Sequence, residues 1–169
     1  MSREAFLEYL TRLDRKAFAT LRRSLAFDPG AFPQVYPYVE RFVGNAGRWK
    51  REAYYLLAGL FAAHQNTSTS AGNMGATLRQ LYLKLDMPPS IEQRFIALLD
   101  ADESQLAHHL RQTVALLKEY SINWALLLDH LIDWNSERRW VQQEWAKAFY
   151  SNPTSDKEET SIQAAPAAE

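Results

Sequence analysis

Apolar residues recur at helical spacing along most of this chain, and nowhere do they alternate as the residues of a strand would. Between Leu7 and Leu25 they return about every 3.6 residues, which predicts one helix over about 4–27, ended by Asp28-Pro29-Gly30. No run rich in Val, Ile and Thr is available for a sheet. The chain is therefore predicted to be all-α, a compact multi-helix bundle of about seven helices without a sheet.

Glycines, prolines and short polar clusters separate the remaining predicted helices. Ser90 and Gln93 have the spacing of a capping box, whereas Asp102 and Ser104 compete as the N-cap of the next helix. Ser121 and Ser136 are expected to cap the last two helices. The predicted ranges are about 38–43, 49–64, 74–85, 90–100, 104–119, 122–134 and 137–150.

A chain of 169 residues is long enough for one domain or for two small lobes that share a core. We expect a single helical domain over 1–150, made up of an N-terminal lobe of about 1–88 and a C-terminal lobe of about 90–150. The polar segment 65–72 is expected to be a mobile loop. The segment 151–169, rich in Ser, Thr, Glu, Ala and Pro, is expected to be a disordered tail.

The net charge of −1 is unevenly distributed. The segment 1–150 carries 18 lysines and arginines against 16 acids, so the acidic excess lies in the tail. No apolar run could cross a bilayer, and no signal segment is visible. Cysteine is absent, which excludes disulfides, thiolate metal sites and a cysteine nucleophile. These features favour a cytoplasmic protein.

Support for catalysis is slight. His130 and Asp133 lie three residues apart on one predicted helix and could pair, but no further ligand stands at metal-binding spacing. No phosphate-binding loop or nucleophile motif is present. The residues therefore indicate neither a cofactor nor a metal, and an enzyme built on His130 and Asp133 is the weakest of three hypotheses.

The arginines and lysines support the other two hypotheses. On one continuous helix Arg12, Lys16 and Arg23 would share a face, with Arg15 and Arg22 beside it. Such cations can bind phosphate oxygens, although most cations off an apolar stripe are simply solvated. Arg111 and Lys118 lie off the core stripe of a later helix, and further cations near helix ends are Arg79, Arg94, Arg138 and Arg139. By contrast, Trp134, Val141 and Trp145 are predicted to form one buried face.

Several short motifs, taken in order, resemble the small subunit of the type I-E CRISPR surveillance complex, the CasB family. Each motif alone is weak, but their joint order over about residues 18–150 is specific. They are Arg22-Arg23-Ser24-Leu25-Ala26-Phe27, Pro29-Gly30-Ala31, Pro37-Tyr38-Val39, Glu52-Ala53-Tyr54-Tyr55-Leu56, Arg94-Phe95-Ile96-Ala97-Leu98-Leu99-Asp100-Ala101, His109-Leu110-Arg111-Gln112, Ile122-Asn123-Trp124 and Trp145-Ala146-Lys147-Ala148-Phe149-Tyr150.

The resemblance implies a non-catalytic, all-helical subunit of the crRNA-guided antiviral complex called Cascade. Members of the family sit there as a pair, contact the backbone and large subunits, hold the displaced non-target DNA strand and stabilise the R-loop. The expected partners are therefore those subunits, a second copy of the chain, the crRNA-containing complex and single-stranded DNA, without a membrane. The alternative is a purely structural helical adaptor whose basic faces bind acidic protein surfaces.

Overall fold

The computed structural model describes residues 2–64 and 70–151, and this part of the chain is entirely helical, without a strand. The predicted all-α class is confirmed, but the described residues form nine α-helices and one 3-10 helix instead of about seven helices. The predicted tail, apart from Ser151, and residues 65–69 of the predicted loop lie outside the described residues. The helices are α1 Arg3–Thr11, α2 Arg15–Ser24, η1 Pro33–Val35, α3 Tyr36–Val43, α4 Arg48–Ala63, α5 Met74–Lys84, α6 Pro89–Asp100, α7 Glu103–Leu116, α8 Trp124–Ile132 and α9 Trp140–Phe149.

The prediction of a single helix over 4–27 is wrong, because the helix is interrupted between α1 and α2. Asp14 adopts an extended conformation, and its side chain accepts a hydrogen bond from the backbone N–H of Ala17 (2.8 Å). An N-cap aspartate satisfies one of the free amides at a helix start, so a new helix begins at Arg15. As a consequence Arg12 and Arg15 belong to different helices.

The N-caps predicted for three other helices are also wrong. Helix α6 begins at Pro89 without a side-chain cap, so the predicted capping box at Ser90 does not form. Asn123 caps α8 in place of Ser121, and α9 begins only after Arg139, whose φ of 51° is left-handed. Asp102 does cap α7, since its carboxylate accepts hydrogen bonds from the backbone N–H groups of Ser104 and Gln105.

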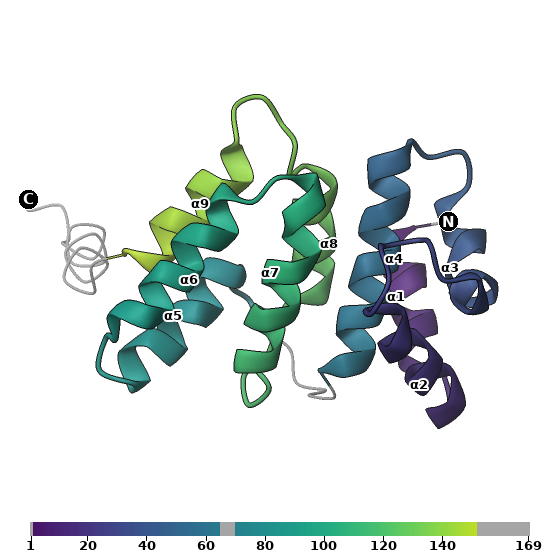
Figure 1. Ribbon diagram of the computed structural model, residues 1–169, viewed down its shortest axis with the longest axis horizontal. Helices are drawn as coiled ribbons and strands as arrows, with labels where there is room; N and C mark the ends of the chain where they lie inside the picture. Colours follow the sequence, from purple (N-terminus) through teal and green to yellow (C-terminus); the bar gives the residue numbers. More distant parts are fainter. Residues whose placement is uncertain (1, 65–69, 152–169) are drawn as a thin grey trace, which may run out of the picture.

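Helices α1 to α4, which we call the N-terminal half, pack around an aromatic cluster. The ring of Phe6 lies 5.1 Å from that of Phe42 and 4.9 Å from that of Tyr54. Helix α4 is central: residues 53–60 are all buried, because α2 and α3 cover one side and α7 and α8 the other (Figure 1).

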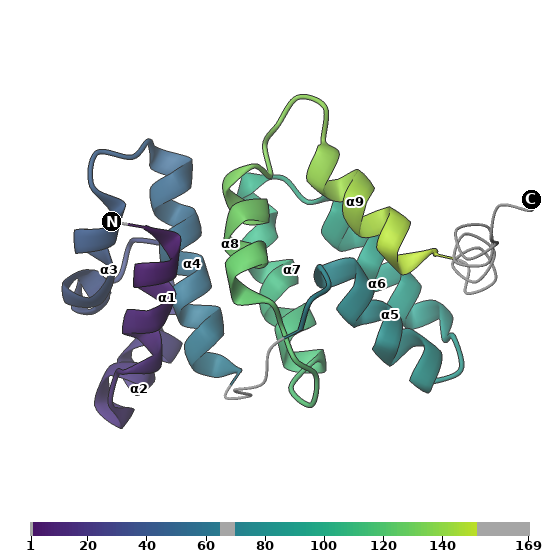
Figure 2. The same cartoon turned by 180° about the vertical axis from the view of Figure 1, so that it is seen from behind.

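Helices α5 to α9 form the C-terminal half, whose closest internal packing is between α5 and α9. Trp134, Val141 and Trp145 are buried together as predicted, with the two indole rings 5.1 Å apart. Helix α5, which was predicted to belong to the N-terminal lobe, packs against α9 and α6 in this half (Figure 2). The division of the chain into two lobes stays a prediction.

Polar contacts connect the two halves across α4 and α1. The indole of Trp49 donates to the carbonyl of Leu131 (2.7 Å), and the imidazole of His64 donates through Nε2 to the carbonyl of Leu117 (2.9 Å). Arg3 of α1 pairs with Asp129 of α8. No described helix is both long and apolar enough to span a membrane.

Candidate nucleic-acid interface

Four cations of α2 share the face of that helix opposite to its buried residues. At about 100° per residue, Arg15, Lys16, Arg22 and Arg23 fall within about 120° of arc. All four side chains are exposed, and none forms an ion pair with another described residue. We call these four residues the α2 basic face. It replaces the predicted face on a single long helix.

Arg12, predicted to share that face, lies outside it. It follows the last residue of α1 and pairs with Glu8, four residues earlier. The break at Asp14 separates it from α2, so the two helices do not present one continuous row of cations.

Three of the other predicted cations bind carbonyl groups near the ends of helices. Arg79 donates to the carbonyl of Phe149 in α9 (2.9 Å), Arg111 to that of Leu25 (2.6 Å), and Arg139 to that of Leu99 in α6 (2.6 Å). Helix C-termini carry unpaired carbonyls and a partial negative charge, which an arginine stabilises. Each guanidinium therefore has a structural role, and a role in binding nucleic acid stays a prediction for all three.

Arg111 also connects α7 to the C-terminal end of α2. Its carbonyl partner, Leu25, is the C-cap of α2 and directly follows the last turn, which carries Arg22 and Arg23. Lys118 is exposed, but it lies in the turn after α7, which ends at Leu116 and not near residue 119 as predicted, so helical spacing does not align it with Arg111. Arg111 is thus anchored at the C-terminal end of α2, the helix that carries Arg22 and Arg23.

Arg138 and Arg139 lie elsewhere. They belong to the connection between α8 and α9, which lies at the upper edge of the molecule in Figure 1, whereas α2 lies at the lower right. Arg138 is exposed and has no ion pair among the described residues. These arginines were predicted as candidates together with the other cations, but the fold does not bring them to the α2 basic face.

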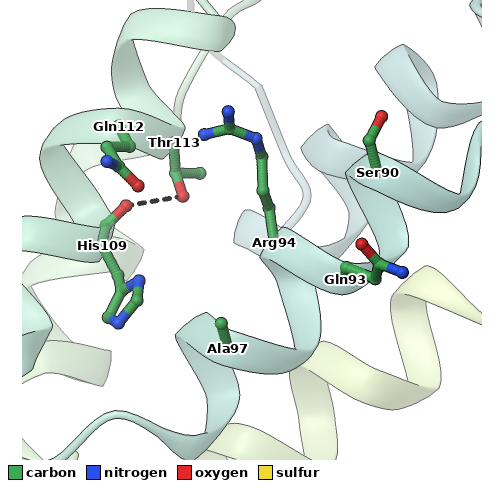
Figure 3. Close-up of a pocket in the computed structure, with 7 residues that line it drawn as sticks. All are labelled: Ser90, Gln93, Arg94, Ala97, His109, Gln112 and Thr113. Carbon is green, nitrogen blue, oxygen red and sulfur yellow. Dashed lines mark hydrogen bonds between the residues drawn. The ribbon is translucent and has the colours of Figure 1, made fainter.

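A polar groove of about 430 Å³ lies between the facing residues of α6 and α7 (Figure 3). Arg94 is exposed, extends from α6 across the groove, and makes no ion pair with another described residue. No carboxylate is among the described side chains that line it. They are Ser90, Gln93, Arg94 and Ala97 of α6 and His109, Gln112 and Thr113 of α7.

Of these groove residues, the predicted site set contained only Arg94. The motif His109-Leu110-Arg111-Gln112 contributed to the family resemblance, but nothing in it indicated that His109 and Gln112 face another helix. Only the packing of α6 against α7 shows this, and their facing residues lie well apart in the sequence. The α6–α7 groove is therefore a feature that sequence reasoning missed.

His130 and Asp133 do not pair as the enzyme hypothesis required. The His130 ring is buried, and its Nδ1 accepts a hydrogen bond from the indole N–H of Trp145 (2.8 Å). No group of three or more potential metal ligands occurs within residues 2–64 and 70–151. His130 is therefore a packing residue in the core between α8 and α9.

This environment predicts an acid-sensitive contribution to stability. Burial lowers the pKa of His130, while the nearby charges of Asp133 and Glu144 oppose the shift more weakly. The unfolded chain, with a histidine pKa of about 6.5, binds this proton more readily than the folded chain does. The free energy of unfolding should therefore fall as the pH drops below about 6.5, by at most about 1.4 kcal/mol per pH unit.

The measurement is the melting temperature between about pH 8 and about pH 5. His130→Gln keeps an acceptor for Trp145 but has no titrating ring, so its pH dependence should be flatter than that of the wild type. His108→Gln, at an exposed position, serves as the control. An unchanged pH profile in His130→Gln would contradict the assignment.

Comparison with known proteins agrees with this architecture. The family model described as CRISPR-associated protein Cse2 matches residues 17–150. The CRISPR-associated protein Cse2 of Thermus thermophilus is 45% identical over 164 residues, which covers 92% of this chain and 94% of that relative.

Solved structures show the same similarity. CasB from Thermus thermophilus matches with a TM-score of 0.79 and 42% identity, covering 90% of this chain and 100% of that one. CasB from M. ruber matches with a TM-score of 0.78 and 43% identity, covering 95% and 98%. A chain of a CRISPR RNA-guided surveillance complex shares the fold, with a TM-score of 0.76 at 21% identity over 96% and 97% of the two chains.

Proposed function

Because this chain belongs to the CRISPR-associated Cse2 family, we propose that it is a non-catalytic subunit of a crRNA-guided surveillance complex and holds the displaced DNA strand. The assembly that we propose for it corresponds to the CRISPR RNA-guided surveillance complex that contains one of its structural relatives. The α2 basic face binds phosphates of the non-target strand and so stabilises the R-loop.

The observation that carries this proposal is the α2 basic face itself. Four exposed cations without ion pairs among the described residues are spread over about 12 Å of helix, on the side that faces away from the core. Arginine forks match phosphate oxygens, and this binding is independent of base sequence. Because the exchange of DNA pairing for RNA–DNA pairing is nearly balanced in free energy, a few phosphate contacts are enough to favour the open state.

The remaining partners follow from the same proposal. The subunit works in the cytoplasm, beside a second copy of itself, and contacts the backbone and large subunits around the crRNA. The net charge of −1 is consistent with a protein that is held in place by partners and contributes local cations rather than a broad basic surface.

Removal of two cations from the α2 basic face tests the proposal. In the complex assembled with this subunit, Arg22→Ala/Arg23→Ala should weaken the binding of target DNA. The loss should be about the same for targets of unrelated sequence, because phosphate contacts do not read the bases. A plot of the logarithm of affinity against the logarithm of salt concentration should also become less steep. Its slope should change by about 1 to 1.5, since each neutralised phosphate of a single strand contributes about 0.7 to the slope. The measurement is target affinity across a salt series.

Lys50→Ala/Lys84→Ala is the matched control, because both lysines are exposed and unpaired among the described residues but lie on α4 and α5. Arg111 is unsuitable for this test since its loss would also free the carbonyl of Leu25. If Arg22→Ala/Arg23→Ala assembles normally and keeps the wild-type slope, the adaptor alternative is favoured, with the arginines on acidic protein surfaces.

A further inference from the structure

The α6–α7 groove offers two kinds of chemistry next to each other. Arg94 supplies a planar cationic fork, whereas Gln93 and Gln112 supply amides and His109 supplies a flat ring. A groove of about 430 Å³ falls within the size range of small-molecule sites, about 300 to 1,000 Å³. The absence of a carboxylate from its described lining favours an anionic ligand.

Arg94 is free to bind a phosphate. Its guanidinium projects towards α7 and is not occupied by a carboxylate or by a carbonyl among the described residues (Figure 3). This distinguishes Arg94 from Arg79, Arg111 and Arg139, whose guanidinium groups bind main-chain carbonyls. A fork of this kind binds two phosphate oxygens at once.

The opposite wall carries groups suited to a nucleobase. Gln112 donates its amide N–H to the ring of His108 (3.3 Å), which leaves its carbonyl oxygen available. A carboxamide can exchange hydrogen bonds with a base edge, and an imidazole ring can stack on a base. Thr113 does not take part, because its hydroxyl donates to the carbonyl of His109 (2.8 Å).

We propose that the α6–α7 groove binds one unstacked nucleotide of the displaced DNA strand, with its phosphate on Arg94 and its base against His109 and Gln112. The inference rests on the proposed function and adds a base contact to it. Arg111 on α7 adjoins the end of α2, and Gln112 is the next residue. A strand leaving the α2 basic face therefore reaches the groove across a single helix. Only a single strand can present a splayed base in this way.

The experiment is photocrosslinking in the complex assembled with the full chain, crRNA and a target duplex. The non-target strand carries 4-thiothymidine at successive positions, and the crosslinked peptides of this subunit are mapped. We expect crosslinks within α6 or α7 at groove residues. Gln112→Glu, which places a carboxylate in the groove, and Arg94→Gln, which removes the cation, should each lower their yield about tenfold.

Both substitutions are at exposed positions, so the fold should be retained, and an unchanged melting temperature checks this. Lys50→Ala, an exposed cation on α4 outside the groove, should leave the yield unchanged. Crosslinks to α2 but never to the groove would overturn this inference and leave the proposed function intact. If the non-target strand crosslinks nowhere on this subunit, both are overturned.

A last crosslinking experiment tests whether the groove binds the DNA strand or the crRNA. When 4-thiouridine is placed in the crRNA instead, the groove should give no crosslink. A groove crosslink from the crRNA, without one from the non-target strand, would overturn the assignment of the groove to DNA.

Discussion

Gly75→Ala is expected to lower the stability of the folded chain by about 3 kcal/mol or more, and the melting temperature by about 10 °C. A Cβ atom on Gly75 would lie 2.1 Å from the carbonyl oxygen of Trp145 and 2.8 Å from its carbonyl carbon. These are backbone atoms of α9, so no flexible side chain can move aside. Relief of the clash requires α5 and α9 to separate, which would open the core of the C-terminal half. Thermal and denaturant unfolding of the purified chain measure the effect.

Gly47→Ala is the matched control, since a Cβ atom there meets nothing within 4 Å and the residue has an ordinary negative φ of −62°. Its stability should stay within about 0.5 kcal/mol of the wild type. Equal stability of the two variants would show that α5 and α9 are not in close contact at Gly75.

Trp145→Ala should have an effect of similar size, about 4 kcal/mol. The side chain is fully buried, packs against Trp134, and donates its indole N–H to His130. Truncation removes that apolar contact and leaves the Nδ1 atom of a buried histidine without its donor, which adds a desolvation cost. Equilibrium unfolding should show the loss, with the melting temperature lower by about 10 °C or more.

The neighbouring Trp140 provides the comparison. It lies on the same helix and its ring also contacts His130 (5.4 Å between ring centroids), but it is 37% exposed. Trp140→Ala should therefore cost about 1 kcal/mol. Comparable losses in the two variants would contradict the assignment of Trp145 as a core residue held by His130.

Apolar periodicity predicted the helices well, because each helix buries one stripe of its own sequence. It placed α4 and α5 within about one residue of their observed bounds and put Trp134 and Trp145 in the core. It failed at Asp14, where the apolar pattern continues through the break between two helices. There the deciding interaction is a side-chain cap, and its geometry does not alter hydrophobic spacing.

The candidate site was less accessible to sequence reasoning. Cations off an apolar stripe could be recognised, but which of them bind carbonyls could not, because those partners are remote: Arg111 and Leu25 are 86 residues apart. The groove depends in the same way on how α6 packs against α7. The sequence pattern therefore predicted a set of candidate cations. The fold shows that some of them form the α2 basic face, that one lies in the groove, and that others bind carbonyls at helix ends.

The close packing of α5 against α9 has a consequence for the order in which the chain acquires its structure during synthesis. The aromatic cluster of the N-terminal half is complete once α4 has been made, but α5 lacks its main partner until residue 149 has left the ribosome. At about 5–20 residues per second, that wait is on the order of ten seconds. During this interval Met74 and Leu78, buried in the finished molecule, face solvent or a chaperone. We therefore expect truncated or stalled chains to aggregate through α5 rather than through the N-terminal half.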